Sequence, residues 1–141
     1  MSIEDKLKEL GIELQTPPSP VANYIPVQQT GNLIYLSGQG PRDEEGNFIT
    51  GKVGADISAE QAYDLSRNTA INLISAMKSY LGSLERVVKI VKVFGMVNAT
   101  SDFTDHPKVI NGCSDFFVEV FEDKGRHARS AVGMGSLPNN M

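Results

Sequence analysis

The residue with the clearest chemical potential is Arg129, in a short β-prone stretch over residues 129–134. In a strand it would share one face with Ala131, Gly133 and Gly135, three of the smallest side chains available. A guanidinium with open space beside it can offer two parallel N–H donors to a carboxylate. The pattern therefore predicts an anion-anchoring pocket, and an interface salt bridge is the alternative. The opposite face is expected to pack against helices; it carries Ala128, Ser130, Val132 and Met134.

Three neutral polar residues in apolar surroundings could complete such a pocket. Tyr24, Ser37 and Asn111 can each orient a ligand or a water molecule through a hydroxyl or an amide. Taken singly, each is also explained by a structural role. They matter only if the fold brings them to Arg129.

Other chemistry is poorly supported by the residues present. With two histidines and one cysteine the sequence has no zinc-ligand spacing, so we expect no metal site. Cys113 lies on the apolar stripe of a predicted helix, and His106 lies at that helix's start. His127 has no evident partner. No glycine-rich phosphate loop is present, so we expect no cofactor.

Length and charge restrict the remaining classes. The chain has 141 residues, enough for one domain with a real core, which we assign to residues 1–141. Thirteen basic and 17 acidic residues give a net charge of −4, which argues against a nucleic-acid partner and anionic membrane surfaces. No apolar run reaches the length of a membrane span, and the N-terminus does not resemble a signal peptide. We expect a cytoplasmic protein.

The elements that must position these residues follow from periodicity and breakers. A short helix is predicted over residues 3–10, and then a hairpin of residues 21–29 and 33–37. A capping box at Ser58 and Gln61 opens a long helix that Gly82 closes. The remaining elements are a strand over 87–97, a helix over 107–124 and the strand at 129–134, with a further short strand near 48–49. The order is β-β-α-β-α-β, which predicts an α+β sheet with two helices on one face.

The strands are apolar on both faces. Phe94 and Met96 lie on one side of the central strand and Val93 and Val97 on the other. Two helices cannot cover both faces of a sheet. The uncovered face is therefore expected to pack against further copies of the chain.

Five stretches together resemble the Rid (YjgF-like) family of reactive-intermediate deaminases. They are residues 21–24 (VANY), 30–39 (TGNLIYLSGQ), 110–112 (ING), 127–132 (HARSAV) and 137–138 (LP). The resemblance implies a chorismate-mutase-like α+β fold and a homotrimer with ligand pockets between subunits. Residues 1–15 would then be an N-terminal helical extension. The family's last strand, with its glutamate, would be expected after residue 141.

The resemblance also implies an activity: hydrolysis of 2-imino acids to 2-keto acids and ammonia, without metal or cofactor. By position, Arg129 matches the arginine that holds the substrate carboxylate. Tyr24, Ser37, Gly38 and Asn111 match residues that line the pocket. Ala131 stands where many active members have a cysteine, and the overall pattern is closer to a less characterised branch.

Two other functions stay open at this point. One is a trimer that binds small carboxylates or keto acids without turnover, which the absence of that glutamate would favour. The other is the endoribonuclease activity often attached to the family, which the acidic charge disfavours.

Overall fold

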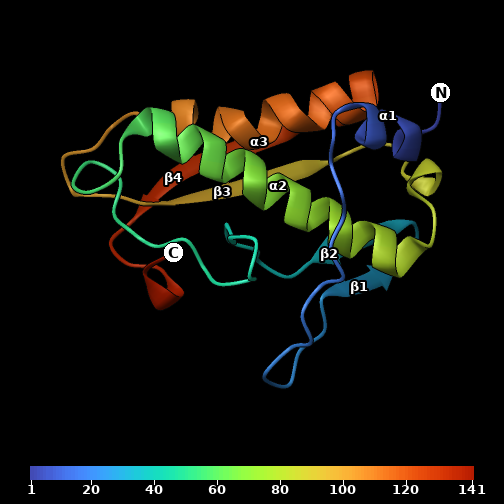
Figure 1. The fold of residues 1–141 in the computed structure, drawn as a ribbon, viewed down its shortest axis with the longest axis horizontal. Helices are drawn as coiled ribbons and strands as arrows, with labels where there is room; N and C mark the ends of the chain where they lie inside the picture. Colours follow the sequence, from blue (N-terminus) through green and yellow to red (C-terminus); the bar gives the residue numbers. More distant parts are fainter.

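The computed structural model describes residues 1–141, and its two long helices lie over the strands (Figure 1). The helices are α1 (Ile3–Glu9), α2 (Ala59–Leu81) and α3 (His106–Phe121), with 3₁₀ helices η1 (Leu84–Arg86), η2 (Glu122–Gly125) and η3 (Pro138–Asn140). The strands are β1 (Val27–Thr30), β2 (Leu33–Leu36), β3 (Lys92–Asn98) and β4 (Ala128–Met134). The predicted order β-β-α-β-α-β is confirmed, and α1 precedes it.

The strands form two two-stranded sheets instead of the single sheet expected from sequence. β1 and β2 pair antiparallel across a two-residue turn, Gly31-Asn32. β3 and β4 pair parallel, from Lys92 opposite Ala128 to Asn98 opposite Met134. A parallel pair needs a long crossover, and α3 provides it. Crossover and register together bring Arg129 beneath this helix.

β3 is shorter than the β-branched run that predicted it. The run begins at residue 87, but Val87 ends η1 with a hydrogen bond to the Leu84 carbonyl. Ile90 donates to the Lys124 carbonyl in η2, which lies before β4 begins. Val91 alone of this segment bonds to β4, since Ala128 N donates to its carbonyl at 3.1 Å, and residues 87–90 have no strand to pair with. The further strand expected near residues 48–49 is a single bridge between Phe48 and Arg42.

The helix boundaries follow their caps. The predicted capping box of α2 is confirmed, since Gln61 N donates to Ser58 Oγ at 3.1 Å and Ser58 N donates to Gln61 Oε1 at 2.8 Å. Gly82 ends this helix with a positive φ of 79°. α3 ends at Phe121 and not at Lys124, because the chain tightens there into η2.

The core lies mainly between α2 and α3. Ile74, Phe116 and Phe117 are almost fully buried there, together with Leu84 from η1. A second cluster joins α3 to β3 and includes Val97, Val109 and Ile110. Together these clusters fix α3 against both the long helix and the parallel sheet.

The face of β4 that packs on α3 is the opposite of the one expected. Arg129 bonds to side chains of α3, and Ala131 packs beside the second cluster. A Cβ placed on Gly133 would overlap His106, and one on Gly95 of β3 would overlap the side chain of Ile110. The small residues around Arg129 therefore admit α3 close to the sheet, where the sequence suggested open space.

The other face of the strands is apolar and exposed, as the two-sided pattern predicted. On β3, Phe94 and Met96 point away from the helices and are 57% and 40% exposed. On β2, Leu33 and Tyr35 are exposed in the same way, while Ile34 and Leu36 pack on the core. We call Leu33, Tyr35, Phe94 and Met96 the outer face.

Candidate functional site

Arg129 lies at the second position of β4, half-buried beneath α3. Its Nη1 donates to Asn111 Oδ1 at 2.8 Å and to Ser114 Oγ at 3.2 Å. Both acceptors lie on α3 three residues apart, a spacing that puts them on one face of the helix. Arg129 and Asn111 are thus brought into direct contact, as required of a shared site.

No carboxylate of the chain neutralises Arg129. The four salt bridges of the structure join Arg67–Glu119, Lys78–Glu4, Lys108–Glu60 and Arg126–Asp123. The two partners of Arg129 are a neutral amide and a neutral hydroxyl. Within one chain its positive charge is therefore held in place by hydrogen bonds but not compensated.

The hydrogen bonds of Arg129 leave one edge of the guanidinium free. Nη1 carries two protons, and Asn111 and Ser114 accept both. Nε and Nη2 bond to nothing in the chain and are not buried. These two nitrogens present parallel N–H groups, the geometry that binds a carboxylate through both oxygens.

Behind Arg129 lies a residue that sequence analysis left without a partner, His127. Its Nε2 lies 2.8 Å from Ser114 Oγ, and its Nδ1 lies 2.6 Å from the carbonyl oxygen of Gly125. Ser114 was not among the predicted site residues. The spacing of Asn111 and Ser114 on one helix face is the sequence signal that could have identified it.

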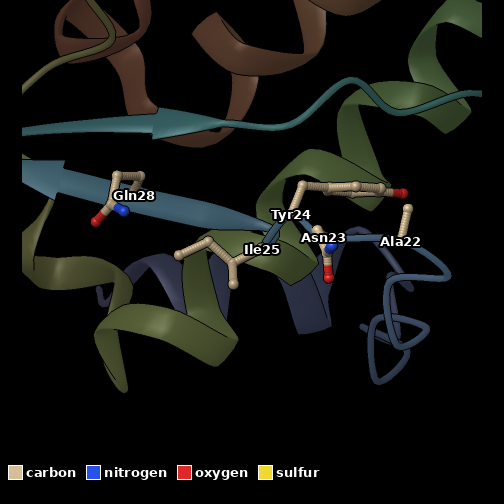
Figure 2. Close-up of a pocket in the computed structure, with 5 residues that line it drawn as sticks. All are labelled: Ala22, Asn23, Tyr24, Ile25 and Gln28. Carbon is tan, nitrogen blue, oxygen red and sulfur yellow. The ribbon is translucent and has the colours of Figure 1, made fainter.

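The remaining predicted site residues gather beside the β1–β2 hairpin. Ser37 Oγ donates to the Ile25 carbonyl at 2.6 Å, and this bond ties the end of β2 to the segment that carries Tyr24. Tyr24 is 53% exposed, and space is open around Gly38. An open hollow of about 660 Å³ lies at Tyr24 and is lined by Ala22, Asn23, Tyr24, Ile25 and Gln28 (Figure 2).

The predicted site residues thus fall into two groups. Arg129 and Asn111 lie together under α3, and Tyr24, Ser37 and Gly38 lie together at the hairpin. None of the side-chain hydrogen bonds joins one group to the other. Arg129 keeps Nε and Nη2 unbonded, and Tyr24 is exposed. Each group could therefore form part of a site that a second chain completes.

Other reactive groups are sparse. Burial raises the pKa of the Cys113 thiol to about 12, against a smaller opposing effect of the nearby Arg129 charge. This thiol stays protonated at neutral pH and is a core side chain. No cluster of three or more His, Cys, Asp or Glu side chains is present to hold a metal ion. None of the helices combines the length and the hydropathy needed to cross a bilayer.

Known proteins resemble this chain over almost its whole length. A family model described as YjgF/chorismate mutase-like, putative endoribonuclease, matches residues 4–141. Protein TCP17 of Trypanosoma cruzi is 38% identical over 133 residues, which are 94% of this chain and 83% of that protein.

Two further relatives extend the comparison to a named activity and to a solved structure. The 2-iminobutanoate/2-iminopropanoate deaminase of Dermatophagoides farinae is 30% identical over 130 residues, 90% of this chain and 86% of that protein. The crystal structure of Atu1372, a protein of unknown function from Agrobacterium tumefaciens, has a TM-score of 0.88 and 39% identity, covering 99% of this chain and 85% of that one. The family match includes both groups of predicted site residues.

Proposed function

Because this chain belongs to the YjgF/chorismate mutase-like family and has its α+β fold, we propose that it hydrolyses reactive 2-imino acids and their enamine tautomers to 2-keto acids and ammonia. The observation that carries this proposal is the uncompensated guanidinium of Arg129, whose Nε–Nη2 edge is oriented and free. The name of the mite relative, a 2-iminobutanoate/2-iminopropanoate deaminase, supports the same chemistry.

The reaction asks little of the protein beyond orientation. Water adds to the electrophilic imine carbon, and the nitrogen takes a proton as the C=N double bond becomes single. The C–N bond of this carbinolamine then breaks, ammonia leaves, and the hydroxyl loses its proton to become the keto group. Arg129 would bind the substrate carboxylate, which is bonded to the imine carbon. This contact would fix the position of the imine carbon for attack by water. No step requires a metal or a cofactor.

The complete site would lie between subunits of a homotrimer. One chain supplies Arg129 and Asn111, and a neighbour supplies Tyr24, Ser37 and Gly38 beside the Tyr24 hollow. The separation of the two groups within one chain supports this arrangement, and so does the exposed apolar outer face. Larger exposed apolar patches on soluble chains mark interaction surfaces.

The direct test is turnover with 2-iminopropionate or 2-iminobutyrate generated in the assay by an amino-acid oxidase. We expect faster release of keto acid and ammonia with the protein present, and the same rate with a chelator. Arg129→Ala should abolish the acceleration. Arg126→Ala is the matched control, because Arg126 is exposed and bonds only to Asp123. Release at the uncatalysed rate by the wild-type protein would overturn the proposal.

A second candidate is a trimer that binds small carboxylates or keto acids without turnover. The neutrality of the side chains bonded to Arg129 favours it, because neither Asn111 nor Ser114 is an acid or base near neutral pH. Cys113 stays protonated there as well. Saturable binding of pyruvate without any acceleration of imine hydrolysis would identify this function. Salt-dependent RNA binding would test the endoribonuclease named in the family's description, which a net charge of −4 disfavours.

A further inference from the structure

We propose that Ser114 and His127 are positioning residues, which lock the Arg129 guanidinium with its Nε–Nη2 edge toward a ligand carboxylate. The inference rests on the proposed function, because it assigns these two residues a purpose in carboxylate recognition. Neither Ser114 nor His127 was among the site residues predicted from the sequence. Three hydrogen bonds in series, from the Gly125 carbonyl to Arg129, carry it.

The direction of each hydrogen bond follows from the groups at the two ends. The Gly125 carbonyl can only accept, so His127 Nδ1 carries the proton of this bond. When the ring is neutral, Nε2 is then the acceptor and receives a hydrogen bond from the Ser114 hydroxyl. The lone pairs of Ser114 Oγ thus remain available to Arg129 Nη1. The network assigns one tautomer to His127 and one hydroxyl orientation to Ser114.

The imidazole ring is itself held from a third side. Phe117, three residues after Ser114 on α3, meets the His127 ring edge-on, with centroids 6.0 Å apart and ring planes at 90°. The Gly125 carbonyl is placed by close packing, since a Cβ on this residue would overlap the Phe117 carbonyl. His127 is therefore fixed by a backbone carbonyl, a hydroxyl and an aromatic ring.

Fixing the guanidinium matters because a flexible arginine must be ordered by its ligand. With both Nη1 protons engaged, rotation of the guanidinium would break two hydrogen bonds. An arginine ordered in advance spares the ligand this entropic cost. Without the Ser114 hydroxyl, Asn111 alone would hold Nη1, and His127 Nε2 would lose its donor.

The test compares Ser114→Val with Ser114→Thr. Both new residues are β-branched and similar in size, but threonine keeps the hydroxyl where valine has a methyl group. We expect Ser114→Val to raise the Kd for pyruvate and the KM for 2-iminopropionate about tenfold, with kcat nearly unchanged. Ser114→Thr should restore both constants. His127→Gln, whose amide oxygen can accept from Ser114, should retain more affinity than His127→Leu. Equal constants for Ser114→Val and Ser114→Thr would overturn the proposal.

A double-mutant comparison shows whether the effect passes through Arg129. In an Arg129→Lys background no guanidinium remains to be positioned, so Ser114→Val and Ser114→Thr should bind pyruvate equally. A tenfold difference that persists in this background would contradict positioning through Arg129.

Failure of the proposed function would be visible separately. If the wild-type protein neither binds pyruvate nor hydrolyses the imine, the proposed function falls. The positioning contact is then decided on ligand-free protein by ¹⁵N NMR. Sharp Arg129 side-chain N–H signals should persist in Ser114→Thr and be lost in Ser114→Val, while the Nδ1–H tautomer of His127, which the Gly125 carbonyl sets, should be present in both. Identical spectra for the two variants would overturn the contact.

Discussion

A half-buried guanidinium without a carboxylate partner is the main functional feature at the scale of single residues. Replacing Arg129 by alanine removes a charge-assisted contact to the ligand, and such losses cost on the order of 2–5 kcal/mol when the partner is left unpaired. We expect pyruvate or 2-ketobutyrate to bind about 30-fold more weakly, or worse, in Arg129→Ala. Arg129→Lys should recover only part, because an ammonium lacks the planar fork. Calorimetric titration measures both.

The same variants distinguish a pocket from an interface salt bridge. A salt-bridge role predicts that Arg129→Ala lowers the melting temperature or dissociates the oligomer and leaves affinity per intact site unchanged. Arg126→Ala, which removes an exposed pair with Asp123, controls for loss of charge alone. A thermal melt beside each titration separates the outcomes, and unchanged affinity in Arg129→Ala would contradict the pocket.

Cys113 gives the chain a specific dependence on alkaline pH. Burial raises the pKa of the folded thiol from an ordinary 9.0 to about 12. Above pH 9 the unfolded state therefore binds fewer protons than the folded state, and the free energy of unfolding falls as pH rises. The loss is up to about 1.4 kcal/mol per pH unit. Urea unfolding above pH 9 should show a steeper decline for wild type than for Cys113→Ala, which retains every other titrating group. Parallel declines would contradict it.

At the scale of elements, the close approach of α3 to the parallel sheet determines where Asn111 and Ser114 lie. A Cβ on Gly95 would overlap Ile110, the neighbour of Asn111 on α3. Gly95→Ala is thus expected to push α3 outward, lower the free energy of unfolding by about 1–3 kcal/mol and weaken pyruvate binding. Gly135→Ala is the matched control, because nothing lies near its Cβ position. Chemical denaturation measures the change, and equal stability of the two variants would contradict the tight contact.

The sequence predicted an element correctly where the deciding contacts join residues close together in the chain. The capping box of Ser58 and Gln61 lies within four residues, and it correctly predicted the start of α2. The prediction of which face of β4 packs on the helices was wrong. Ala131 and Val132 are both apolar, so the alternation of side chains along the strand does not show which of them faces the core. The deciding contact, from Arg129 to α3, joins residues far apart in the chain. The strand predicted from residue 87 failed similarly, since residues 87–90 have no strand to pair with.

Contacts between residues far apart in the chain also limited the prediction of the candidate site. Arg129 and Asn111 were both predicted and do lie in contact. His127 was left without a role, because its partner Ser114 precedes it by 13 residues on a different element. No spacing rule connects a helix to the strand that follows it, so only the packed structure identifies this pair.

At the scale of the whole molecule, one chain has two incomplete groups of site residues and an exposed apolar face. The two long helices lie over the strands (Figure 1), and the side chains of the outer face are exposed. Association through this face would bury Phe94 and Met96 and bring neighbouring chains together at their edges. A composite site would then make activity depend on assembly, because the two groups of one chain are not joined to each other.

A charge placed on the outer face tests this dependence of activity on assembly. We expect the protein to be a trimer at micromolar concentration and neutral pH, by light scattering or sedimentation. Phe94→Glu should dissociate it, because the charge would lie in the buried interface, while helical circular dichroism is retained. Val93→Glu should instead unfold the chain at a cost of several kcal/mol, since Val93 packs against both core clusters. The dissociated Phe94→Glu chain should lose imine turnover although Arg129 is intact. A monomeric wild type, or an active monomeric Phe94→Glu, would contradict a site shared between subunits.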